Sequence, residues 1–190
     1  VYQLAKNGGY CFISRPRRFG KSLLITTLEA YFQGRKELFE GLAISELEKD
    51  WKQYPVLHID LNAERYSDTQ ALISIMDRHL HLFESVYGHD PMEKTLADRF
   101  IGIIRRAYEQ TGKQVVILVD EYDKPLLEAI GNPELQDDYR KILKSVYGVG
   151  KTMDSYIRFT SFTGVTKFSK VSVFSDLNNL EDITMDEQYA

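Results

Sequence analysis

The triplet Gly20-Lys21-Ser22 has the residue types and spacing that most clearly indicate chemistry. It lies between a short apolar segment, residues 10–13, and an apolar-periodic segment that begins at Leu23. A glycine turn that joins a strand to a helix presents backbone N–H groups to an anion. The lysine adds a mobile positive charge, and the serine hydroxyl can ligate Mg²⁺. The triplet therefore predicts a phosphate-binding loop.

Two adjacent carboxylates, Asp120 and Glu121, form a second chemical feature. They follow five consecutive apolar residues, 115–119, a run typical of a strand buried on both faces of a parallel sheet. Ligands bind at the carboxyl ends of such strands. Asp120 is expected to hold a magnesium ion, as a Walker B aspartate does, and Glu121 to orient and polarise an attacking water. An isolated pair of this kind is more often a simple cap, but the upstream triplet favours the nucleotide interpretation.

The loop departs from the pattern G-x-x-x-x-G-K-[ST], because Arg15 stands six residues before Lys21, where a glycine is expected. Pro16 pushes Arg15 towards an extended backbone and removes one N–H donor. The amides of residues 18–22 remain available, and Lys21 is expected to bind the β- and γ-phosphates. The expected nucleotide-binding residues of the loop are Arg17, Arg18, Phe19, Gly20, Lys21, Ser22 and Leu23, with Ser22 also a metal ligand.

Three arginines of this loop have several possible roles. Arg15, Arg17 and Arg18 could contact phosphate, pair with acidic residues elsewhere or face another molecule. The sequence favours none of these three roles over the others.

Composition limits the class of protein. A chain of 190 residues with 43% hydrophobic and 27% charged residues suits one globular domain, and its net charge of -4 argues against a surface that coats nucleic acid. The single cysteine, Cys11, excludes an internal disulfide framework. No apolar run approaches the roughly 18 residues of a membrane span. We expect a cytoplasmic protein, and a chain that begins at Val1 is expected to be part of a longer one.

Strands that alternate with helices predict an α/β fold with a mostly parallel central sheet of about five strands. Residues 38–45 are expected to be irregular, with room for a short strand. The predicted strands are a segment ending near Ser14 and residues 55–61, 115–119, 157–164 and about 180–184. The predicted helices are residues 21–32, 69–87, about 92–110, and 124–148 in two pieces broken at residues 131–133.

Thr163 ends the fourth predicted strand. If this strand lies between the phosphate-loop strand and the acidic strand, Thr163 comes close to the terminal phosphate and can sense it. A plain turn at Thr163-Gly164 explains the same residues equally well. Lys167 and Lys170, just beyond, could reach phosphate or be solvated.

Four segments together resemble the AAA-ATPase-like domain of bacterial multi-copy proteins. They are residues 15–22 (RPRRFGKS), 119–125 (VDEYDKP), 162–170 (FTGVTKFSK) and 174–182 (FSDLNNLED). The resemblance covers nearly the whole chain. It implies a P-loop NTPase three-layer sandwich of the additional-strand, catalytic-glutamate type, with ATP and Mg²⁺ as cofactors. It also implies that Arg15 is a variant native to the family.

Such proteins usually continue into a helical region and often into a PD-(D/E)xK nuclease-like domain. Residues 1–190 are accordingly expected to form a single ATPase-like domain without its C-terminal helical lid or effector domain. A second copy or another protein is a possible partner. Nucleic acid is expected only through the further domain, and no membrane partner is expected. The preference for ATP over GTP comes from the resemblance alone.

The leading hypothesis is an ATPase that drives a conformational change in a larger protein or assembly. A non-hydrolysing nucleotide switch is the main alternative, although such a switch does not need Glu121. A small-molecule kinase should carry an acceptor pocket and an arginine-rich lid, and a nuclease needs a separate upstream acidic strand. Neither pattern is clear in the sequence. No arginine finger can be assigned, and Tyr122 and Asp123 are candidates for shaping the site.

Overall fold

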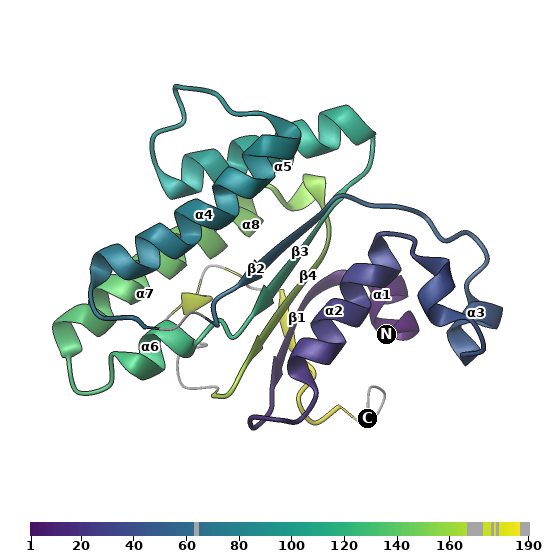
Figure 1. Cartoon of the computed structure of the whole chain (residues 1–190), viewed down its shortest axis with the longest axis horizontal. Helices are drawn as coiled ribbons and strands as arrows, with labels where there is room; N and C mark the ends of the chain where they lie inside the picture. Colours follow the sequence, from purple (N-terminus) through teal and green to yellow (C-terminus); the bar gives the residue numbers. More distant parts are fainter. Residues whose placement is uncertain (63–64, 167–172, 176, 178, 187–190) are drawn as a thin grey trace.

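We describe a computed structural model of the chain, which covers residues 1–62, 65–166, 173–175, 177 and 179–186 (Figure 1). Its described part contains one sheet of five parallel strands in the order β2-β3-β4-β1-β5. Helices cover both faces, so the fold is the α/β sandwich of a P-loop NTPase that the sequence predicts. The strands are β1 (Gly9–Ser14), β2 (Val56–Asp60), β3 (Val115–Asp120), β4 (Ile157–Gly164) and β5 (Leu180–Asp182).

The helices divide into two layers. The larger layer, α4, α5, α7 and α8, lies on one face of the sheet, and α1, α2 and α3 lie on the other (Figure 1). The helices of the described residues are α1 (Tyr2–Asn7), α2 (Lys21–Phe32), α3 (Ala43–Leu47), α4 (Thr69–Tyr87), α5 (Leu96–Thr111), α6 (Lys124–Glu128), α7 (Pro133–Tyr147) and α8 (Val149–Thr152), with the 3₁₀ helices η1 (Lys36–Phe39) and η2 (Asp154–Tyr156). None of them is long and apolar enough to cross a bilayer.

Strand β3 is buried along its whole length because both helical layers pack on it. Val115, Ile117 and Val119 belong to the core under the larger layer, and Val116 and Leu118 to the core under α2. This alternation is the period of two that strand geometry imposes. It explains why the sequence reads as an unbroken apolar run.

Several details of the structure differ from the sequence expectations. Helix α5 begins at Leu96 and not near residue 92, because the Thr95 hydroxyl accepts from the Asp98 amide and starts the helix there. Residues 38–45 contain parts of η1 and α3 and no strand, and α1 was not predicted. Lys167 and Lys170 lie outside the described residues.

The strand order brings the chemistry-bearing ends together. Strand β4 lies between β1 and β3, as expected, and Ser14 is aligned with Gly164 while Val119 is aligned with Phe162. Because all five strands are parallel, their carboxyl ends meet at one edge of the sheet. The site can therefore be assembled from loops that lie far apart in the sequence.

Candidate functional site

The loop between β1 and α2 has the backbone geometry of an anion cradle. Arg18 (φ 67°) and Gly20 (φ 74°) are left-handed, whereas Phe19 between them is not. Such alternation turns successive N–H groups towards one concave side. Gly20 also precedes the first turn of α2, and its carbonyl accepts from the Leu24 amide at 2.9 Å. An anion in this loop would thus meet N–H groups and the positive end of a helix dipole.

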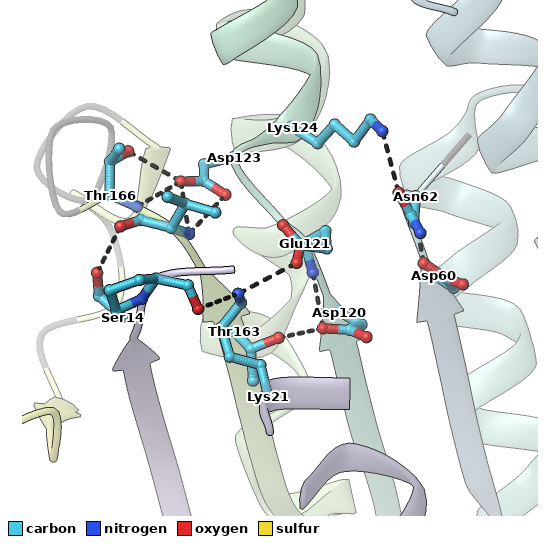
Figure 2. Close-up of polar contacts among 12 residues, drawn as sticks. Ser14, Lys21, Asp60, Asn62, Asp120, Glu121, Asp123, Lys124, Thr163 and Thr166 are labelled. Atoms are coloured by element: carbon cyan, nitrogen blue, oxygen red, sulfur yellow. Dashed lines mark hydrogen bonds and ion pairs between the residues drawn. The ribbon is translucent and has the colours of Figure 1, made fainter. Parts of the chain in front are cut away.

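Lys21 connects this loop to the acidic strand. Its side chain is only 4% exposed, and its Nζ lies 3.3 Å from Glu121 Oε1. The same Nζ donates to the Pro16 carbonyl at 3.3 Å. A buried ammonium requires such partners. In this structure Glu121 therefore occupies the place of a counter-ion for Lys21 (Figure 2).

Asp120 and Thr163 form a buried hydrogen-bonded pair. The Thr163 hydroxyl donates to Asp120 Oδ1, and the Glu121 amide donates to the same oxygen at 3.1 Å. Asp120 Oδ2 bonds to none of the described residues, which leaves it available to a cation. Thr163 is fully buried and contacts the site through Asp120 (Figure 2).

Glu121 adopts a left-handed backbone (φ 54°) immediately after β3. This conformation is uncommon and costly for a residue with a side chain. The chain must turn here so that the Tyr122 amide can donate to the Thr163 carbonyl at 2.9 Å. The turn directs the Glu121 carboxylate towards Lys21 and away from the buried Asp120.

Gly20, Lys21 and Glu121 help to line an open polar cavity of about 440 Å³, whereas the buried Asp120 and Thr163 are not among its lining residues. Four of its lining residues are cationic and one, Glu121, is anionic, so the cavity favours a multiply charged anion. Arg17 and Arg18 are exposed and form no ion pair with the described residues. The cavity is lined by Arg17, Arg18, Gly20, Lys21, Ser22, Leu23, Asn62, Glu121 and Lys124.

The donor set fits a magnesium ion that is shared with a phosphate. Mg²⁺ in nucleotide sites is held by one or two protein ligands, with water and phosphate oxygens completing the shell. The Ser22 hydroxyl and the Asp120 carboxylate can supply those protein ligands. The described residues contain no cluster of three His, Cys, Asp or Glu side chains that could hold a metal by themselves.

Asp123 fixes the loop that follows β4. Its carboxylate is fully buried and accepts from the Val165 amide at 3.0 Å, the Thr166 amide at 2.7 Å and the Thr166 hydroxyl at 2.8 Å. The Tyr122 hydroxyl donates to the Thr166 carbonyl at 2.8 Å, and the Ser14 hydroxyl to the Val165 carbonyl at 3.1 Å. The ends of β1, β3 and β4 are thereby tied together (Figure 2).

A second cavity of about 260 Å³ also adjoins the phosphate loop, and we call it the apolar cavity because most of its lining residues have apolar side chains. Gly20 and Lys21 line both cavities, so the two meet at the loop. Arg15 lines this second cavity and not the polar one. Its lining is Val1, Gln3, Leu4, Ile13, Arg15, Phe19, Gly20, Lys21, Leu24 and Ile183.

Two residues of the polar cavity were missed by the sequence reasoning. Asn62 follows β2, and Lys124 begins α6; the Lys124 Nζ donates to Asn62 Oδ1 at 3.0 Å. The rule that ligands gather at the carboxyl ends of parallel strands could have indicated Asn62, two residues after the end of β2. Nothing in the local pattern around Lys124 could have indicated that it faces Asn62.

Comparisons with known proteins show which sequences this chain is similar to. A family model described as "Predicted AAA-ATPase" matches residues 1–174. A protein of Azotobacter chroococcum mcd 1, described as "Uncharacterized protein in vnfD 5'region", is 42% identical over 189 residues, which is 99% of this chain. The chain spans about a third (36%) of the length of that relative.

Proposed function

This chain belongs to the family described as predicted AAA-ATPases, and on that basis we propose that it binds ATP with Mg²⁺ and hydrolyses it. The observation that carries the proposal is the contact of Lys21 with Glu121 beside the buried pair of Asp120 and Thr163. A phosphate-binding lysine and a carboxylate placed to act on water lie at one cavity. Hydrolysis needs both groups, whereas simple binding needs only the first.

Triphosphate binding changes the partner of Lys21. The β- and γ-phosphates enter the loop and accept hydrogen bonds from its amides and from the Lys21 ammonium. Lys21 exchanges the Glu121 carboxylate for phosphate oxygens, which carry more negative charge. Glu121 is thereby released at the moment when the substrate arrives.

The released Glu121 then orients a water molecule and accepts its proton. The water oxygen bonds to the γ-phosphorus, the bond from that phosphorus to the β–γ bridging oxygen breaks, and ADP and phosphate leave. Ser22 and Asp120 would hold the magnesium ion, which would neutralise charge on the phosphates. Thr163 keeps Asp120 in position through its hydrogen bond to Oδ1.

The apolar cavity supports a nucleoside triphosphate over a simple polyphosphate. A nucleotide has a charged end and an aromatic end, and the two cavities meet at Gly20 and Lys21. We place the phosphates in the polar cavity and the base in the apolar one, where Phe19 offers an aromatic face. Phe19 is 62% exposed, and it makes no ring contact with the described residues.

We propose that the chain is part of a longer protein in which the hydrolysis cycle drives a conformational change, with the arginine finger supplied by a neighbouring subunit. Residues 1–190 are proposed to be one ATPase-like domain that is completed by a C-terminal helical lid. A cytoplasmic location and a protein partner are part of the same proposal. The second candidate, a nucleotide switch without turnover, would use the same binding residues but not Glu121.

The test is a calorimetric titration of ATP with Mg²⁺, together with an assay of phosphate release, on the unsubstituted protein, Lys21→Ala and Glu121→Gln. Lys21→Ala should abolish measurable binding, because it removes the only buried cation of the described site. Glu121→Gln should bind ATP at least as tightly, since it no longer competes for Lys21, and should lower turnover by about 10²–10⁴-fold.

The two candidate functions predict different results for the unsubstituted protein. Binding with phosphate release that is lost in Glu121→Gln supports the ATPase. Binding without release in any variant favours the switch. Equal behaviour of all three proteins contradicts the phosphate-loop interpretation.

A further inference from the structure

Lys124 occupies the wall of the polar cavity that is formed by the ends of β2 and β3. It is the first residue of α6, four positions after the end of β3. Its Nζ donates to Asn62 Oδ1 at 3.0 Å and lies 3.6 Å from Glu128 Oε1. The backbone of Asn62 is itself held, because its main-chain N–H donates to Asp60 Oδ1 at 2.8 Å (Figure 2). The Lys124 side chain thus lies at the cavity wall in contact with Asn62.

The present partners of Lys124 hold it only weakly. Asn62 contributes a neutral amide oxygen, and Glu128 is a partly exposed i,i+4 partner of the kind worth a few tenths of a kcal/mol at a helix surface. An ammonium has three protons to donate. Lys124 can therefore contact a stronger anion in the cavity without losing a strong interaction.

The charge of Lys124 is also unmatched within the cavity lining. Glu121, the one acidic lining residue, is paired with Lys21. A terminal phosphate that binds Lys21, as proposed above, lies in the cavity that Glu121 and Lys124 also line. The charge of Lys124 is therefore available to the γ-phosphate, the group by which ATP differs from ADP.

We propose that Lys124 binds the γ-phosphate and makes the site prefer ATP to ADP, with Asn62 holding the lysine in the nucleotide-free form. The inference rests on the proposed function, because it concerns how the phosphates of the bound nucleotide are held. When ATP binds, the Lys124 ammonium leaves the Asn62 oxygen and donates to a phosphate oxygen instead. The Asn62 side chain is then released from Lys124 when the triphosphate is bound and contacts it again after phosphate leaves.

The test measures the affinities of ATPγS and ADP, each with Mg²⁺, for the unsubstituted protein, Lys124→Ala and Lys124→Arg. Lys124→Ala should lower the affinity for ATPγS by about tenfold, as expected for loss of one charge-assisted hydrogen bond. It should lower the affinity for ADP by less than twofold. Lys124→Arg keeps the charge and should retain most of the preference. Raising the salt concentration should reduce the preference in the unsubstituted protein more than in Lys124→Ala.

Lys141→Ala is the matched control, because Lys141 also pairs with an acid at i,i+4 spacing, Asp137, but on α7 away from the cavity. It should leave both affinities unchanged. Equal weakening of ATPγS and ADP in Lys124→Ala, or no change in either, overturns the proposal while the ATPase assignment stands. Failure of the unsubstituted protein to bind ATPγS overturns both.

Discussion

The left-handed backbone of Arg18 shows how single residues of the site are held. A glycine would adopt φ 67° without cost, whereas a residue with a side chain is destabilised there by roughly 1–2 kcal/mol. The loop keeps an arginine at this position, with its side chain at the polar cavity. The positive charge is thus retained at the expense of local backbone stability.

We predict that Arg18→Gly is more stable than Arg18→Ala by roughly 1 kcal/mol, because only the glycine relieves the strain. The free energy of unfolding, measured by urea denaturation, tests this. Both variants lose the guanidinium, so their affinities for ATP should fall by similar factors. Equal stability of the two variants would show that Arg18 is not strained in solution.

The part of the site that sequence could predict is the part that follows from adjacent residues. Lys21 and Ser22 follow from a loop pattern, and Asp120 and Glu121 from an apolar run that ends in charge. The contact of Asn62 with Lys124 joins residues 62 positions apart in the sequence. It depends on how β2 and β3 align, which local pattern does not specify.

At the scale of elements, Glu48 joins α1, α2 and the segment after α3. The Tyr31 hydroxyl donates to Glu48 Oε2, the Asp50 amide donates to Oε1 at 2.9 Å, and Lys6 Nζ lies 3.2 Å from Oε2. Burial opposes the charge of Glu48, but these three partners together lower its pKa from 4.5 to about 2. The ionised carboxylate therefore stabilises the layer that carries the phosphate-loop helix.

This pKa predicts an acid-dependent loss of stability. Because the folded pKa is below the unfolded one, the contribution of Glu48 is complete above about pH 5 and is lost as the pH falls towards 2. Glu48→Gln should lower Tm by roughly 2–4 °C at pH 7 and by little near pH 2. Calorimetry across this pH range measures the difference. Glu46→Gln, an exposed neighbour in α3, should show no such dependence.

The elements that sequence predicted best have local causes. Helix α2 matches residues 21–32 because a glycine precedes it and an apolar stripe runs through it, and β3 follows its apolar run. Helix α1 was not predicted because tertiary contacts hold it: Arg158 Nη2 donates to the Ala5 and Lys6 carbonyls. Short segments of this kind have too little periodicity to be recognised by themselves.

At the scale of the whole molecule, the two cavities predict that base and phosphate recognition can be separated. Phe19→Ala should lower the affinity for ATP by roughly tenfold, the value of one base–aromatic stack, and leave the affinity for inorganic triphosphate unchanged. Titration calorimetry with both ligands tests this. Leu82→Ala is the control, because Leu82 is similarly exposed (57%) but lies on α4 and lines neither cavity. Equal loss of both ligands in Phe19→Ala would contradict the placement of the base.

The position of β1 inside the sheet, between β4 and β5, has a consequence for biosynthesis. Among the described strands, β1 pairs with β4 and β5, whereas β2 and β3 can pair with each other much earlier. A nascent chain therefore exposes the apolar residues Cys11, Phe12 and Ile13 until residues 157–164 have been synthesised, on the order of ten seconds at ordinary translation rates. During that interval the strand that leads into the phosphate loop is a segment for chaperones to protect. Ribosome-bound chains that end before β4 should be prone to aggregation.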